Sequence, residues 1–277
     1  MYWRQECGNR RTRIGDLLAL TGNTTEARAY FQQALAILEP LAAADPQNDM
    51  VQQNLMTVQN NLGLLLLRLK ETEPGFAYLR KVVASREAVA ARNPSDLQVR
   101  DNLAITYRNL GSHLGRAGQT AEALDNFGKA LAIHAARAKA DPSNLQVRHH
   151  QAITGYLAGG VRERSGDLSG ALNDYQQAIQ LLEELLKADP LKAQMRGDLA
   201  YAYSLVGRVQ TKFGEQKKDD TGQARVHYTQ AKSWYQRSRE LWLDLRQRAQ
   251  LDKQDEGEPE RLAQAIAQCD EILAQMK

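Results

Sequence analysis

The chain has 277 residues and carries 36 Lys and Arg against 33 Asp and Glu, a net charge of +3. So small a positive excess gives no indication of nucleic-acid binding. Hydrophobic residues make up 43% and charged residues 25% of the chain, which excludes wholesale disorder. Proline is scarce, and Ala, Leu, Gln, Arg and Glu dominate, a composition that favours helices.

Membrane insertion and secretion are also disfavoured. The first residues lack the apolar core of a signal peptide. The longest apolar run, at residues 62–67, is far shorter than the roughly 20 residues of a membrane span. Cys7 and Cys269 stand near opposite ends of the chain and indicate neither a disulfide framework nor a metal site. We therefore expect a cytoplasmic protein with no membrane partner.

The sequence repeats itself with a period of 48 residues. A glycine recurs at this spacing, at Gly15, Gly63, Gly111, Gly159 and Gly207. A pair of Asp or Asn followed by proline recurs in the same way, at residues 45–46, 93–94, 141–142 and 189–190. A fixed period of this kind is typical of stacked helical repeats.

Each repeat is predicted to contain two amphipathic helices, and the third repeat shows the pattern most clearly. We expect helices over 97–117 and 120–140, because apolar residues recur at helical spacing in both segments. Asp96 is suited to cap the first helix. Pro142 ends the second, since proline cannot donate a backbone hydrogen bond. The small Gly111 lets the two helices approach closely, and Phe127 fills the space that remains.

This spacing resembles that of the tetratricopeptide repeat, a helix pair of about 34 residues. The residues that carry the resemblance in the third repeat are Tyr107, Leu110, Gly111, Leu114, Ala123, Phe127 and Ala130. The longer period here corresponds to about two additional turns in each helix. The Asp-Pro-Ser-Asn turn at 141–144 and the acidic run at 258–262 are similar to repeat regions that follow bacterial eukaryotic-like Ser/Thr protein kinases. The kinase catalytic motifs themselves are absent from the sequence.

The expected fold is an all-α, right-handed superhelical solenoid of about five helix-turn-helix repeats with a C-terminal capping helix. The solenoid is expected over residues 1–250, with repeats at about 1–46, 47–94, 95–142, 143–190 and 191–250. The last repeat carries an insertion, which we expect to form a charged loop near 215–226. A linker at 251–258 then leads to the capping helix at 259–277, which a solenoid needs to cover its final apolar surface. Trp242 is expected in the core of the last helix pair.

No set of residues indicates catalysis. His149 and His150 are adjacent, so on a helix they point about 100° apart and are poorly placed to chelate one ion. A phosphate-binding glycine-rich loop is absent from the sequence. We therefore expect a non-catalytic protein that uses neither a metal nor another cofactor.

In tetratricopeptide folds the first helix of each pair lines a concave groove, so the resemblance implies a protein or peptide partner. One groove position is basic in four repeats, at Arg68, Arg116, Arg164 and Lys212. Further candidate groove residues are Asn60, Arg108, Tyr156 and Arg208. The basic column has two interpretations. It binds carboxylates or phosphates of an acidic partner, or each cation stabilises its helix end by about 0.3–1 kcal/mol.

The predicted function is a non-catalytic interaction scaffold that binds a peptide or protein partner through the concave groove. The alternative is a regulatory or self-association module of a larger bacterial Ser/Thr kinase-type signalling protein. A first helix that already contains Met1 and an aromatic last helix favour this alternative. The sequence leaves open the identity of the partner, the oligomeric state, whether the chain is a fragment, and whether the concave or the convex face is used.

Overall fold

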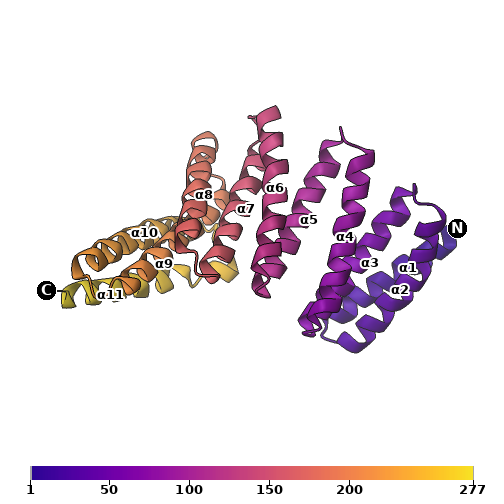
Figure 1. Cartoon of the computed structure of the whole chain (residues 1–277), viewed down its shortest axis with the longest axis horizontal. Coiled ribbons are helices and arrows are strands. Elements are labelled where there is room, and N and C mark those ends of the chain that lie inside the picture. Colours follow the sequence, from indigo (N-terminus) through magenta and orange to yellow (C-terminus); the bar gives the residue numbers. More distant parts are fainter. Residues whose placement is uncertain (1, 277) are drawn as a thin grey trace. The chain divides into compact units, whose positions relative to one another are not determined.

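The computed structural model describes residues 2–276, which form α-helices and one 3-10 turn and contain no strand (Figure 1). The helices are α1 (Tyr2–Leu20), α2 (Thr24–Ala44), α3 (Asp49–Arg68), α4 (Thr72–Arg92), α5 (Leu97–Arg116), α6 (Thr120–Ala140), α7 (Leu145–Arg164), α8 (Leu168–Ala188), α9 (Ala193–Gln216), α10 (Thr221–Gln247) and α11 (Glu258–Gln275), with η1 (Lys253–Asp255) before the last. The prediction of an all-α chain of successive helices is confirmed, and the third repeat agrees with its predicted bounds to within a residue. Within the described part of the chain, no helix is both long enough and apolar enough to cross a bilayer.

The chain divides within α5 into two compact units. The N-terminal unit ends at Leu110, and the C-terminal unit begins at Gly111. The core of the N-terminal unit is built on α1 to α4, with Phe31, Leu38 and Leu62 fully enclosed. The C-terminal unit has one cluster around Tyr175 and another in which α11 packs on α10.

The 48-residue period appears first as a recurring helix start. Side-chain oxygens of Asn48, Asp96 and Asn144 accept hydrogen bonds from the backbone N–H three residues later, at 3.2, 3.1 and 3.1 Å. A helix start leaves its first backbone N–H groups without intrahelical partners, and these side chains satisfy one of them. The predicted cap at Asp96 is confirmed.

The repeated glycines mark the points where the two helices of a pair come closest. A Cβ atom on Gly159 would lie 2.7 Å from Tyr175 Cε1, and one on Gly207 would lie 2.6 Å from Tyr235 Cδ1. Gly15 stands in the same relation to Phe31. Each ring therefore occupies the space that a side chain at the glycine would need.

The predicted loop at 215–226 is wrong. Helix α9 continues to Gln216 and α10 begins at Thr221, so the turn between them comprises only residues 217–220. The inserted residues extend both helices, because a second glycine–aromatic contact holds the extension together. A Cβ atom on Gly214 would lie 2.7 Å from Tyr228 Cε2, and these two residues stand seven positions from Gly207 and Tyr235.

At the C-terminal end, α11 covers the aromatic side chains of α10. Leu262 and Cys269 are each 2% exposed and belong to one cluster with Tyr235 and Trp242. The prediction that Trp242 lies in the core is confirmed, since only 4% of it is exposed.

We predict that Gly207→Ala lowers the free energy of unfolding by about 1–3 kcal/mol, because its methyl group forces Tyr235 to move. Gly128→Ala in α6 is the matched control, since a Cβ there has no neighbour within 4 Å. That change should raise stability by about 0.5–1 kcal/mol through helix propensity. Urea unfolding followed by circular dichroism measures both, and equal effects of the two changes would contradict the close-packing argument.

Candidate functional site

Four of the predicted groove residues meet in one hollow of the C-terminal unit. Arg116 from α5, Tyr156 and Arg164 from α7, and Arg208 from α9 line a space of about 210 Å³. Tyr201 of α9 also borders it. We call this space the arginine hollow. It lies where the first helices of three successive pairs present their side chains to one another.

A carboxylate lies beneath this surface. Glu163 of α7 is only 4% exposed, and both its oxygens are engaged by cations from α9. Arg208 donates from Nε and Nη2 to the two oxygens, each at 2.7 Å. Lys212 Nζ lies 2.9 Å from Oε1. The Tyr175 hydroxyl donates to Oε2 at 2.8 Å.

These contacts determine the protonation states of Glu163 and Tyr175. Burial acts to raise the pKa of Glu163, but the hydrogen bonds from Arg208, Lys212 and Tyr175 outweigh it and lower the pKa to about 2. Burial and the nearby Glu163 charge raise the pKa of Tyr175. Glu163 is therefore a carboxylate and Tyr175 a neutral phenol at neutral pH. The charges of Arg208 and Lys212 are directed inward, toward this carboxylate.

Arg116 and Arg164 differ from those two cations. Both are exposed, and neither has an acidic partner in the part of the chain that the structure describes. The guanidinium of Arg164 lies beside two glycines. A Cβ atom on Gly115 would be 3.2 Å from Nη2 of Arg164, and a Cβ atom on Gly160 would be 3.6 Å from Nη1. The glycines leave room for it to lie flat along the helices. Both guanidinium groups are available to an anion from outside the chain.

The remaining predicted residues lie in the N-terminal unit and do not join this hollow. Arg68 Nη2 donates to the backbone oxygen of Ala19 at 3.0 Å, near the end of α1. Arg68 itself belongs to α3, so this contact is made to the end of another helix and does not test whether Arg68 stabilises the end of its own helix. Asn60 Nδ2 donates to Asn61 Oδ1 at 3.2 Å. Arg108 precedes Gly111 and so also belongs to this unit.

The basic column thus separates into three kinds of residue. Arg68 contacts a helix end, Lys212 pairs with a buried carboxylate, and Arg116 and Arg164 face a hollow. The sequence places Glu163 at a groove position of the fourth repeat but does not indicate its pairing with Arg208 and Lys212, on which this separation depends. A signal was present, because sister repeats carry the uncharged Leu67, Gly115 and Thr211 at that position.

Two family models match the sequence. A model described as tetratricopeptide repeat matches residues 9–39 and 55–95, and one described as bacterial transcriptional activator domain matches residues 105–212. No curated protein sequence matches the chain. Together with the 48-residue period and the helix pairs, these matches identify the chain as a tetratricopeptide-type repeat protein.

Several solved structures are similar to the chain at low identity. BtubC from P. vanneervenii is 13% identical, with 90% of each chain covered and a TM-score of 0.49. A variant of a putative kinesin light chain from Podosopora anserina is 18% identical, covering 87% of this chain and 98% of that one, with a TM-score of 0.49. PilF of Pseudomonas aeruginosa is 16% identical, covering 99% and 90%, with a TM-score of 0.42. Likeness at this level carries no information about function.

We predict that Glu163→Gln lowers the free energy of unfolding by about 1–3 kcal/mol at neutral pH, because charged hydrogen bonds are lost. The pKa of Glu163 is depressed in the folded chain, so its stabilisation is present above the ordinary pKa of about 4.3 and is lost as the pH falls toward 2. The native chain should therefore lose stability over that interval, and Glu163→Gln should lose less.

Denaturant unfolding at a series of pH values measures this difference. Glu271→Gln, at an exposed position of α11, is the control and should keep the native pH dependence. A Glu163→Gln variant with the full native loss of stability in acid would contradict the assigned role of the carboxylate.

Proposed function

We propose that the chain is a protein-interaction scaffold that binds an extended peptide bearing carboxylate or phosphate groups in the arginine hollow. The observation that carries the proposal is that Arg116 and Arg164 face one hollow without acidic partners. The tetratricopeptide-type architecture supports it, because stacked helix pairs present extended surfaces rather than closed pockets. A non-catalytic role follows from this proposal and stays a prediction.

The chemistry of the hollow suits such a ligand. Guanidinium groups bind carboxylates and phosphates in a bidentate manner. The rings of Tyr156 and Tyr201 meet edge to face, with centroids 5.6 Å apart, and offer an apolar wall beside the charges. The ion pairs of Glu163 hold Arg208 and Lys212 in place, so less conformational freedom is lost when a ligand binds.

We predict that Arg116→Glu/Arg164→Glu weakens binding of a fluorescein-labelled oligoglutamate peptide at least about tenfold, or 1.4 kcal/mol. The reversed charges remove both attractions and repel the ligand. Fluorescence anisotropy measures the affinity, with a phosphoserine peptide as the second anionic ligand and an oligoserine peptide as the neutral one.

Lys139→Glu/Lys187→Glu is the matched control. It makes the same change in net charge on exposed positions of the same unit, away from the hollow. This control should keep most of the native affinity. The proposal is overturned if both double variants lose affinity equally, because binding would then depend on net charge alone. It also fails if the native chain binds oligoserine as tightly as oligoglutamate.

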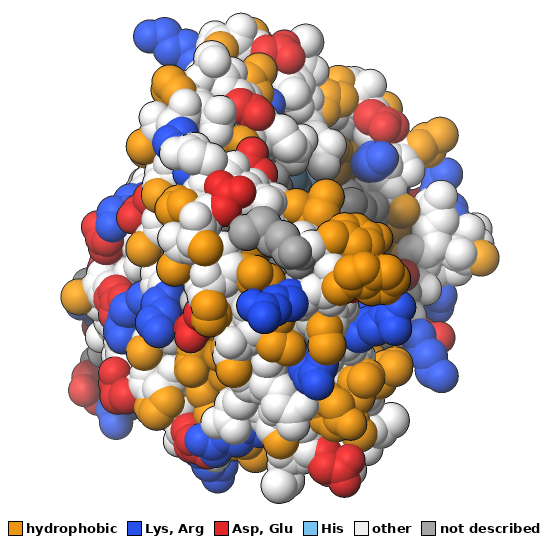
Figure 2. Space-filling model, turned by 90° about the vertical axis from the view of Figure 1, so that its right-hand side faces the viewer, with side chains coloured by type: hydrophobic (Ala, Val, Ile, Leu, Met, Phe, Trp, Pro, Cys, Tyr) orange, Lys and Arg blue, Asp and Glu red, His pale blue; other side chains and the backbone are white. Residues whose placement is uncertain are grey.

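A second candidate function, self-association, is favoured by the outer face of α1. Trp3 is 79% exposed and Leu17 is 64% exposed. One period later, the equivalent Val51 and Leu65 of α3 are 0% and 3% exposed within the core shared with α2. Figure 2 shows hydrophobic side chains gathered on the side of the molecule where the N-terminal helices lie.

A second copy of the chain is the occupant that this face suits best. The face of α3 that corresponds to the exposed face of α1 packs against α2. In a two-fold symmetric dimer, the exposed face of α1 would pack against the same face of α1 in the second copy. No described feature bears on an attached kinase domain, and that part of the expectation stays a prediction.

We predict that the native chain forms dimers with rising concentration and that Leu17→Glu prevents this, because it places a charge in the apolar contact. Sedimentation velocity measures the effect. Leu191→Glu, at a residue that is 61% exposed in the C-terminal unit, is the control and should still dimerise. A native chain that remains monomeric at the highest soluble concentration would contradict self-association.

A further inference from the structure

The arginine hollow has two chemically different ends. Arg116 and Arg164, the last residues of α5 and α7, supply guanidinium groups at one end. Tyr156 precedes Arg164 by about two turns of α7, or roughly 12 Å along the helix axis, and lies against Tyr201 at the other end. A ligand that fills the hollow therefore meets cations at one end and aromatic rings at the other.

The aromatic end offers ring surface to a ligand. The hydroxyl of Tyr156 donates to Asp198, a residue that does not line this hollow, so Tyr156 contributes its ring. Tyr201 is 39% exposed, and the buried Val161 and Leu205 add apolar lining. Aromatic side chains gain from contact with other rings and from the burial of their own apolar area. This end of the hollow is therefore suited to an aromatic ring.

The cationic end carries more positive charge than one carboxylate balances. No Asp or Glu is among the described residues that line the hollow. Beneath it, Arg208 and Lys212 share the single carboxylate of Glu163, which leaves this group with a net positive charge. Arg116 and Arg164 add two further cations. A phosphate monoester carries a charge of about −1.5 to −2 at pH 7 and presents three acceptor oxygens, so it matches this end better than a carboxylate does.

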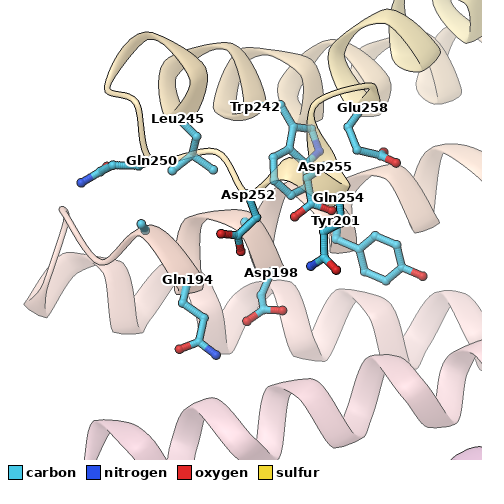
Figure 3. Close-up of a pocket in the computed structure, with 12 residues that line it drawn as sticks. Gln194, Asp198, Tyr201, Trp242, Leu245, Gln250, Asp252, Gln254, Asp255 and Glu258 are labelled. Carbon is cyan, nitrogen blue, oxygen red and sulfur yellow. The ribbon is translucent and has the colours of Figure 1, made fainter. Parts of the chain in front are cut away.

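A second, larger hollow also borders Tyr201 and sets the direction of the ligand (Figure 3). Its volume is about 630 Å³, and none of the described residues that line it is Lys or Arg. It is lined instead by four carboxyl groups, those of Asp198, Asp252, Asp255 and Glu258. Figure 3 shows the ring of Tyr201 extending away from Asp198 and Asp252. These carboxyl groups repel a phosphate group from the tyrosine end of the arginine hollow.

We propose that the arginine hollow selects phosphotyrosine among the anionic residues of a peptide partner. The phosphate lies near Arg116 and Arg164, and the phenyl ring lies against Tyr156 and Tyr201. Phosphoserine and glutamate bring an anion without a ring, so they leave the aromatic end unfilled. This inference rests on the proposed function, whose site it shares, and narrows the ligand of that site to one kind of residue.

The test uses three fluorescein-labelled peptides of glycine and serine that differ only in their central residue, which is phosphotyrosine, phosphoserine or tyrosine. Fluorescence anisotropy should show that the native chain binds the phosphotyrosine peptide at least about tenfold more tightly than either of the others. Phenyl phosphate should displace this peptide at a lower concentration than inorganic phosphate does, because only phenyl phosphate carries a ring.

Tyr201→Thr removes the exposed ring and keeps the cations. Thr57 holds the equivalent, exposed position of α3, so the fold accepts this residue there. The variant should bind the phosphotyrosine peptide as weakly as the phosphoserine peptide and should bind the phosphoserine peptide as the native chain does. Tyr2→Thr, at a residue that is 66% exposed in the N-terminal unit, is the control and should keep the native preference.

Arg116→Gln/Arg164→Gln should weaken binding of both phosphopeptides, because it removes the cations that both of them use. Lys139→Gln/Lys187→Gln removes the same charge at exposed positions outside the hollow and should weaken neither. The proposal is overturned if the native chain binds phosphotyrosine no more tightly than phosphoserine. It is also overturned if Tyr201→Thr weakens both phosphopeptides equally, or if the two double variants lose affinity equally.

The two proposals fail separately. Equal affinity for phosphotyrosine, phosphoserine and oligoglutamate, lost in each case with Arg116→Gln/Arg164→Gln, would keep the acidic-peptide function and remove the preference for phosphotyrosine. A chain that binds the phosphotyrosine peptide but not oligoglutamate would keep the phosphotyrosine site and remove the wider acidic-peptide function. A chain that binds none of the anionic peptides would overturn both.

Discussion

The close approach of paired helices at glycine is the constraint on which the rest of this structure depends. An aromatic ring occupies the space where a side chain would lie at Gly15, Gly159 and Gly207, whereas Leu79 and the backbone of Gly75 occupy it at Gly63. The contact fixes both the distance between two helices and their register along the chain. Because it recurs every 48 residues, side chains at equivalent positions of successive first helices face in equivalent directions. The arginine hollow follows from this regularity, since α5, α7 and α9 each contribute to it.

The fifth repeat uses the same contact twice. Gly214 and Tyr228 add a second close approach beyond Gly207 and Tyr235, and this contact stabilises the lengthened α9 and α10. The long helix pair then needs a partner for its aromatic face, which α11 supplies. The segment 250–258 that connects α10 to α11 has to pass beside the start of α9, and its carboxylates thereby come to lie near Asp198. The hollow lined by Asp198, Asp252, Asp255 and Glu258 is therefore a consequence of how the last helix pair is closed.

The parts of this structure that could be predicted from the sequence are those set by local chemistry or by the period. The cap at Asp96, the helix bounds of the third repeat and the burial of Trp242 follow from residue type and spacing. The loop predicted at 215–226 is only a turn at 217–220, because the helical state of the residues on either side of the turn depends on the tertiary contact of Tyr228 with Gly214. The ion pair between Glu163 and Arg208 joins residues 45 positions apart, and hydrophobic spacing carries no information about such a pair.

The arginine hollow and the larger hollow lined by Asp198 share Tyr201 as a wall residue and are also joined by a hydrogen bond. Tyr156, which lines the arginine hollow, donates its hydroxyl proton to Asp198 at 2.9 Å. Asp198 also contacts His149, so its position is set by two side chains of α7. The basic and acidic side chains of the two neighbouring hollows therefore do not form ion pairs with one another. Glu163 pairs inward with Arg208 and Lys212, while Asp198 is held by two groups that are not guanidinium or ammonium ions. Arg116 and Arg164 on one side, and Asp252 and Asp255 on the other, thus have no ion-pair partner of opposite charge among residues 2–276.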